Sequence, residues 1–307
     1  MPERTWSTAT RSLFLLLSLV WGLNFVFVNF GLAVAGPLWL AMFRAGLGAA
    51  GTAVIWVILR PGQRLDLRGR RDAMLLGLPN TMLFFALWFS AARTVLPGVT
   101  AVAIYTYPLW VAVLSGPVLA HRLTGRHWIS AAVGFSGVAL ISQVGTLAGA
   151  SISLLAIAEL LLAAVAWAVG TVVFQRRFRR ELMLEANLFQ LVGGTAGLVV
   201  LTLVFVPTQA PPLSPELLGT VVWLGIVGTA VAYSIWYYLL GRTRAAPLSA
   251  YLFLVPVVAL TASALIFGER LSAWQLIGVV LVLASIYGIG RAPGASDPPR
   301  AAAGTES

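Results

Sequence analysis

The 307-residue chain contains no cysteine, which excludes disulfides, thiolate nucleophiles and cysteine-based metal sites. It also carries little charge: Asp, Glu, Lys and Arg make up 10% of its residues, against about 25% in an ordinary soluble domain. Apolar types account for 59%, and the mean hydropathy is +0.91. A composition this apolar predicts a protein that lies within a lipid bilayer.

Lysine is absent as well, so all 20 basic residues are arginines, and the net charge is +10. Such a charge could indicate nucleic acid, but the arginines gather in short segments between apolar runs, as is typical of membrane proteins. Because of this placement we expect no nucleic acid as a partner, and because no GxxxxGK[ST] loop is present we expect no nucleotide. The only histidines, His121 and His127, have no neighbouring pair of acids, so we expect no metal, no cofactor and no enzyme active site.

Ten apolar segments are long enough to cross the hydrocarbon core, which takes about 20 residues of helix. Turn-forming pairs such as Gly36-Pro37 separate them. The segments are 12–34, 37–59, 73–92, 98–120, 126–146, 152–175, 186–206, 216–239, 246–268 and 272–290. The sequence therefore predicts an all-α membrane protein with ten transmembrane helices. A short N-terminus, 1–11, precedes them, and a polar, Pro-rich tail, 291–307, follows and is expected to be disordered.

The positions of the arginines predict the orientation. If both termini are cytoplasmic, only Arg93 and Arg270 fall in outside loops and Arg44 falls within a span, while the other arginines lie on the inside. This distribution follows the positive-inside rule and favours ten spans with cytoplasmic N- and C-termini. The alternative, a signal peptide cleaved near the small residues at 33–36, is disfavoured because its apolar run is too long and is copied later in the chain.

The second half of the chain repeats the first. A shift of 148 residues places Pro108 on Pro256, and a shift of 146 places Trp21 on Trp167. Because each copy holds five spans, an odd number, the second copy enters the membrane from the opposite side. Inverted repeats of this kind are typical of secondary transporters, with the substrate site near the midplane between the repeats. The two predicted five-helix repeats are residues 12–146 and 152–290.

Pro108 and Pro256 both fall inside expected spans. Proline removes one backbone hydrogen bond from a helix and bends it. Membrane helices carry more proline than soluble ones, so a tolerated kink is one explanation. Because both copies keep the proline, we favour a matched pair of gating bends that free carbonyl groups toward a cavity.

Several stretches of this sequence match a known pattern. They are "VWGLNF" at 20–25, "FRAG" at 43–46, "LWFSAARTVLPG" at 87–98, "IYTYPLW" at 104–110, "AWAVGT" at 166–171 and "YLFLVPVVALTASALIFGERLSAWQLIGVVLVLAS" at 251–285. With them the chain resembles the EamA family of the drug/metabolite transporter superfamily over residues 12–290. The resemblance implies ten helices around a central cavity in the inner (plasma) membrane of a bacterial cell. It also implies movement of amphipathic solutes, amino acids including aromatic ones or drugs, often out of the cell. The family's Glu before Arg is kept at Glu269 but is His121 in the first half.

Three polar residues inside the expected spans are candidates for function. Glu159 is a carboxylate within the membrane, which marks a functional site by default and here could carry a coupling proton; a side chain that reaches the outer interface is the alternative. Arg44, the repeat partner of Gln190, could attract a substrate carboxylate or bind backbone carbonyls. Asn24 could hydrogen-bond a substrate or join two helices.

Aromatic residues are abundant within the spans: Trp21, Trp88, Tyr105, Tyr107, Trp167, Tyr233, Trp236, Tyr237, Tyr251 and Phe253. Membrane aromatics often form belts at the interface, but most of these lie away from the span ends. We therefore expect a cavity that suits flat apolar or cationic solutes. The residues predicted to line it are Trp21, Asn24, Arg44, Trp88, Tyr105, Tyr107, Trp167, Tyr233, Trp236 and Tyr251.

The leading hypothesis is a secondary transporter of small organic solutes that works by alternating access and whose partners are its small-molecule substrate and the lipid bilayer. A carrier of lipid-linked substrates is the alternative, and a membrane-embedded enzyme or a channel is disfavoured because no catalytic cluster or polar filter is visible. Proton coupling through Glu159 and facilitated diffusion both remain open as driving forces.

Overall fold

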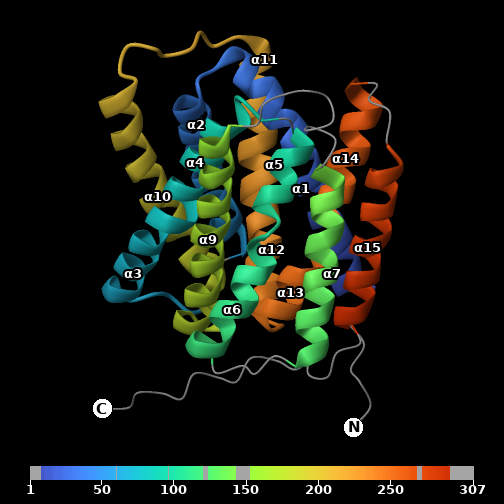
Figure 1. Cartoon of the computed structure of the whole chain (residues 1–307). Coiled ribbons are helices and arrows are strands. Elements are labelled where there is room, and N and C mark those ends of the chain that lie inside the picture. The colour runs from blue at the N-terminus through green and yellow to red at the C-terminus, as the bar shows by residue number, and fades with distance from the viewer. Residues whose placement is uncertain are drawn as a thin grey trace.

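Figure 1 shows a computed structural model of the chain, which describes residues 8–59, 61–95, 97–119, 124–142, 153–267 and 272–290. All regular elements in these ranges are helical. The first half holds α1 (Thr8–Val34), α2 (Pro37–Leu59), α3 (Leu67–Gly77), η1 (Leu78–Leu83), α4 (Phe84–Ala92), α5 (Pro97–Ile104), α6 (Tyr107–Leu119) and α7 (Gly125–Ser142). The second half holds α9 (Leu154–Arg177), η2 (Arg180–Leu182), α10 (Met183–Phe205), α11 (Pro215–Val222), η3 (Trp223–Val231), α12 (Ala232–Leu240), α13 (Ala245–Tyr251), α14 (Leu254–Phe267) and α15 (Ala273–Gly290).

Six continuous helical stretches are long and apolar enough to cross a membrane. They are Thr8–Val34, Pro37–Leu59, Leu67–Ala92, Leu154–Arg177, Arg180–Phe205 and Pro215–Leu240. Three shorter apolar helices accompany them, at Tyr107–Leu119, Leu254–Ile266 and Leu276–Ser285. The chain is therefore an all-helical protein of the membrane class, as its composition predicts. The predicted tail at 291–307, Glu269 and His121 lie outside the described residues.

Two of the predicted spans are interrupted helices. The span at 98–120 is divided between α5 and α6 at Tyr105 and Thr106, and the span at 246–268 is divided between α13 and α14 at Leu252 and Phe253. Pro108 and Pro256 follow these breaks and lie in the first turns of α6 and α14. Proline fits a first turn because the backbone N–H that it lacks would have no partner there. The two prolines thus begin new helices rather than bend continuous ones.

Two of the long stretches contain a π-helical segment. In each case an α-helix passes into η1 or η3 and then continues as α4 or α12. A π-helix closes its hydrogen bonds over five residues instead of four, and such segments occur frequently at functional sites. The two segments lie at corresponding positions of the two halves, as do the two interrupted helices.

Close helix crossings join the two halves at these π-segments. A Cβ at Gly48 of α2 would overlap the side chain of Thr229 in η3, and one at Gly194 of α10 would overlap Thr81 in η1. Gly193 is closer still, because a Cβ there would overlap the backbone of Met74 in α3. Small residues allow such close approach, which drives helix association in membranes.

At two further crossings, an asparagine of the first half faces a glycine of the second half. Gly228 of η3 faces the side chain of Asn24 in α1, whereas Gly170 of α9 faces the side chain of Asn80 in η1. In both places a Cβ on the glycine would overlap the amide. Each crossing therefore has room for one amide side chain. The amide comes from α1 at the crossing with η3, and from η1 at the crossing with α9.

The halves are interleaved rather than separate. The helix α2 packs on η3 and α10, and α3 packs on α9 and α10. The helices α7 and α15 lie side by side at the right of the view in Figure 1, one from each half. A surface between the halves therefore runs through the whole bundle.

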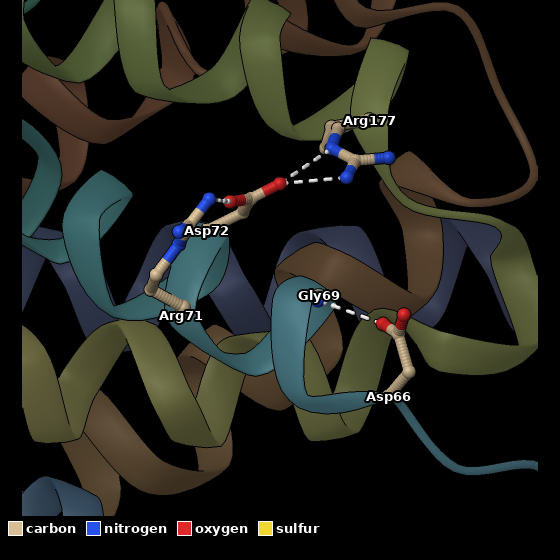
Figure 2. A network of polar contacts seen from close by, with 5 residues as sticks. All are labelled: Asp66, Gly69, Arg71, Asp72 and Arg177. Atoms are coloured by element: carbon tan, nitrogen blue, oxygen red, sulfur yellow. Dashed lines mark hydrogen bonds and ion pairs between the residues drawn. The ribbon is translucent and has the colours of Figure 1, made fainter.

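Charged residues join the halves near the start of α3 (Figure 2). The Asp72 carboxylate accepts hydrogen bonds from Nε and Nη2 of Arg177 at 3.0 and 2.6 Å, and Arg71 lies 3.5 Å away. Asp66 caps α3 by accepting the Gly69 N–H at 2.7 Å. The Asp72–Arg177 pair connects α3 with the C-terminal turn of α9, but an exposed pair of this kind adds at most about 1 kcal/mol.

Candidate functional site: an aromatic cavity with a buried arginine

A central cavity with about 370 Å³ of empty space, its opening included, lies between the two halves. Its walls come from α1, α2, α4, the junction of α5 and α6, α9 and α12. The residues from the predicted set that line it are Trp21, Asn24, Arg44, Trp88, Tyr105, Tyr107, Trp167 and Tyr233. The structure thus brings together side chains from distant parts of the chain, and their role in substrate binding stays a prediction.

The walls of the cavity are mostly aromatic. Trp167 meets Trp21 and Tyr233 edge to face, with ring centroids 6.0 and 5.1 Å apart, and Phe84 lies 4.9 Å from Trp167. Edge-to-face contacts of this kind add attraction beyond simple burial. They hold the rings in fixed positions, so the cavity offers flat apolar surfaces of defined orientation to a ligand.

Arg44 is the charged group of the cavity. Its side chain is almost fully buried, its Nε donates to Thr229 Oγ1 at 3.0 Å, and its Nη2 donates to the Gly228 carbonyl at 3.5 Å. The guanidinium carbon lies 4.4 Å from the Phe85 ring centroid and 5.0 Å from that of Trp88. These contacts fix the guanidinium in place, partly through cation–π attraction.

The charge of Arg44 has no counter-ion among the described residues. No carboxylate there forms an ion pair with it, and its Nη1 has no hydrogen-bond partner. A buried charge without a partner is costly, so such a group usually pairs with an anion or with water. The cavity therefore presents a fixed cationic donor to whatever enters it.

The π-segment η3 explains how α2 can hold an arginine here. The Gly228 carbonyl accepts from both Arg44 and Asn24, whose Nδ2 lies 3.4 Å away. Asn24 Oδ1 in turn accepts from Trp223 Nε1 at 3.2 Å. Both ends of the Asn24 amide are therefore used between α1 and η3. This arrangement favours the interpretation of Asn24 as a link between helices, although it also lines the cavity.

Two predicted residues do not line this cavity. Trp236 is fully buried behind Trp21, with ring centroids 5.7 Å apart. Tyr251 ends α13 and meets Phe14 edge to face at 5.6 Å. Trp236 thus contacts a ring that lines the cavity, whereas Tyr251 packs on a residue that does not, and neither lines the empty space.

Three lining residues were not among those predicted: Phe25, Phe84 and Ile104. Phe25 follows Trp21 by four positions, and Phe84 precedes Trp88 by four. Residues four apart lie on the same face of a helix, so the spacing could have identified both.

Glu159 lies away from the cavity. It is half-buried on α9, and its carboxylate accepts a hydrogen bond from the exposed hydroxyl of Ser90 in α4. It is not among the residues that line the cavity. This location favours the alternative interpretation, a side chain that reaches the outer interface.

A family model described as "EamA-like transporter family" matches residues 10–143 and, a second time, residues 154–291. The chain belongs to the EamA-like transporter family. Both halves of the chain thus match the same family model.

Several curated proteins resemble this EamA-like chain over most of its length. One from Escherichia coli (strain K12), named "Probable amino-acid metabolite efflux pump", is 32% identical over 293 residues, 89% of this chain and 92% of that protein. An uncharacterized transporter of Synechocystis is 30% identical over 286 residues, 87% of this chain and 86% of that protein. A solved crystal structure aligns with a TM-score of 0.75 over 92% of this chain and 96% of that chain, at 19% identity, which shows a shared fold.

The EamA-like chain is thus a transporter of the drug/metabolite class rather than an enzyme, and a multi-pass protein of the inner membrane that moves a small molecule. The aromatic cavity around Arg44 is its candidate substrate site.

Proposed function

We propose that this EamA-like chain exports small amphipathic carboxylates, in particular amino acids with aromatic or branched apolar side chains. The observation that carries the proposal is the unpaired Nη1 of Arg44 inside an aromatic cavity. A carboxylate that reaches this nitrogen would form a charge-assisted hydrogen bond in a medium of low dielectric constant. The apolar side chain of the solute would lie against Trp21, Trp88 and Trp167.

The proposed solute needs both parts. The carboxylate neutralises Arg44, whose charge is otherwise unpaired, and the apolar part replaces water against the rings. A purely cationic solute would be repelled by the arginine, although aromatic walls alone would favour it. The name of the Escherichia coli relative, an amino-acid metabolite efflux pump, supports both the substrate class and the direction of transport.

We further propose that the chain crosses the membrane ten times as two inverted five-helix repeats, with both termini in the cytoplasm. The paired π-segments, the paired interrupted helices and the two matches to one family model support the repeat. The arginine distribution supports the orientation. In such a fold the halves exchange conformations, and a site between them opens to one side at a time.

Transport into proteoliposomes tests the proposal. Labelled phenylalanine and leucine are compared with phenethylamine, which lacks the carboxylate, and with a cationic dye, each with and without an imposed pH gradient. We expect saturable flux of the two amino acids and little protein-dependent flux of the amine or the dye. Protein-dependent flux of the amine equal to that of phenylalanine would contradict the proposed role of the carboxylate.

Replacing Glu159 by glutamine is expected to leave amino-acid flux, and its response to the pH gradient, within about twofold of the unchanged protein. The reason is that Glu159 contacts Ser90 outside the cavity. The measurement is the same uptake assay over a range of pH. Flux that loses its dependence on the gradient in Glu159→Gln would instead make Glu159 the proton site.

A further inference from the structure

A second, smaller cavity adjoins the central one. It has about 190 Å³ of empty space, its opening included, and lies between the later turns of α1, the end of α4 and the start of α5. Its lining includes Val28, Asn29, Val95 and Thr100. It shares two lining residues with the central cavity, Phe25 and Trp88.

We propose that this smaller cavity is the outlet through which the solute leaves the central site, and that the Phe25 and Trp88 rings are the gate between the two. The inference rests on the proposed function, because it concerns the path of the same solute. No residue of this outlet was among the sequence predictions except Trp88.

The partition between the cavities consists of side chains. The ring centroids of Phe25 and Trp88 lie 5.1 Å apart, and both rings are almost fully buried. Both residues line the central cavity and the smaller one. Rotation of one or both side chains would therefore join the two spaces without a change in the helices. Side-chain rotation is fast compared with movement of whole helices.

The chemistry of the outlet suits a solute in passage. Its polar groups are uncharged: the Asn29 amide and the Thr100 hydroxyl, which donates to the Val95 carbonyl at 3.4 Å. These groups can hydrogen-bond the ammonium or carboxylate of an amino acid, but they offer no opposite charge to retain it. We therefore expect weaker binding here than beside Arg44, so that the solute can move on.

The gate is also in contact with the charged group of the central site. The Arg44 guanidinium carbon lies 5.0 Å from the centroid of the Trp88 ring. A carboxylate that binds Arg44 neutralises the cation that attracts this ring. Binding of the carboxylate at Arg44 and opening of the gate therefore both involve the Trp88 side chain.

The chain has no cysteine, so a single introduced cysteine is a unique label site in the natural background. Thr100→Cys places a thiol in the outlet, and Thr94→Cys places one on the exposed turn before it as a matched control. Proteoliposomes of known orientation are treated with a membrane-impermeant maleimide, with and without saturating phenylalanine. We expect Thr100→Cys to react with the maleimide only from the face opposite the arginine-rich loops. Saturating phenylalanine should change the rate of this labelling by at least about threefold. Thr94→Cys should react at the same rate with or without phenylalanine.

A filling variant gives a second test. In Thr100→Trp the smaller cavity is occupied, so flux should fall about tenfold or more, while equilibrium binding of phenylalanine to the purified protein stays within about twofold. Labelling of Thr100→Cys from the cytoplasmic face would contradict the proposed outlet. A labelling rate that phenylalanine does not change would contradict it as well. So would undiminished flux in Thr100→Trp. Absence of phenylalanine binding by the unchanged protein would instead overturn the proposed substrate.

Discussion

Replacing Arg44 by methionine is expected to lower phenylalanine flux roughly 10- to 100-fold. The basis is the loss of one charge-assisted hydrogen bond to the carboxylate, about 1.5–3 kcal/mol, at about 1.4 kcal/mol for each tenfold. Uptake into proteoliposomes, measured as initial rates over a range of phenylalanine concentrations, provides the value. Because the interaction acts on binding, the concentration for half-maximal flux should rise.

The fold should survive this substitution. Thr229 Oγ1 also donates to the Leu224 carbonyl at 2.8 Å, and the Gly228 carbonyl also accepts from Asn24. Both partners of Arg44 therefore keep a hydrogen bond, and a methionine replaces the apolar stem of the arginine as far as about the position of Nε. Exchange of a buried ion for an apolar residue is often neutral or stabilising.

Arg93→Met is the matched control, because Arg93 is an exposed arginine at the end of α4. It should leave flux within about twofold. Unchanged phenylalanine flux in Arg44→Met, with Arg93→Met also unchanged, would remove the arginine from the proposed site. Loss of flux in both variants would point to a general effect of positive charge.

Replacing Gly193 by alanine is expected to destabilise the protein by about 1–3 kcal/mol, the range for an overpacked core. A methyl group there would overlap backbone atoms of Met74, and backbone cannot move aside unless α3 moves away from α10. The preference of helices for alanine over glycine, up to about 1 kcal/mol, acts in the opposite direction and is outweighed. Thermal unfolding of the purified protein in detergent measures the effect.

Gly219→Ala supplies the comparison, because a Cβ at Gly219 in α11 meets no atom within 4 Å. It should be neutral or slightly stabilising through helix propensity alone. Equal melting temperatures for Gly193→Ala and Gly219→Ala would show that α3 and α10 are not held at the close distance seen here.

The cavity residues were accessible to sequence reasoning because of where they lie along the helices. Trp21, Arg44 and Tyr233 are mid-span residues with polar atoms, and lipid offers no partners for such atoms. They were therefore expected to face inward, and the structure places all three at the wall of the cavity, where their role in substrate binding stays a prediction. Glu159 shows the limit of this reasoning. Its position in the sequence gives its depth along α9 but not which way it points around the helix, and it faces Ser90 instead of the cavity.

The π-segments were not predicted. Nothing in "WLGIVGTAV" or "LPNTML" distinguishes a π-helix from an α-helix, since the extra residue per turn is stabilised by contacts with other helices. Those contacts, Asn24 with Gly228 and Gln190 with Asn80, join residues far apart in the sequence. For the same reason the carbonyl that orients Arg44 could not be found from the chain alone. Phe25 was missed although its spacing from Trp21 places both on one helix face, because phenylalanine also occurs on lipid-facing surfaces.

The two crossings at which an asparagine faces a glycine make the two halves of the chain different from each other. The repeat offsets of 146 and 148 residues place Asn24 on Gly170 and Asn80 on Gly228. A transporter made of two first halves would therefore place Asn24 against Asn80 at both crossings, where only one amide fits, and one made of two second halves would place Gly170 against Gly228, without either amide. We therefore expect that neither half pairs with a second copy of itself in this arrangement. The two halves would then be complementary parts that depend on each other, and a chimaera with two first halves should fail to assemble.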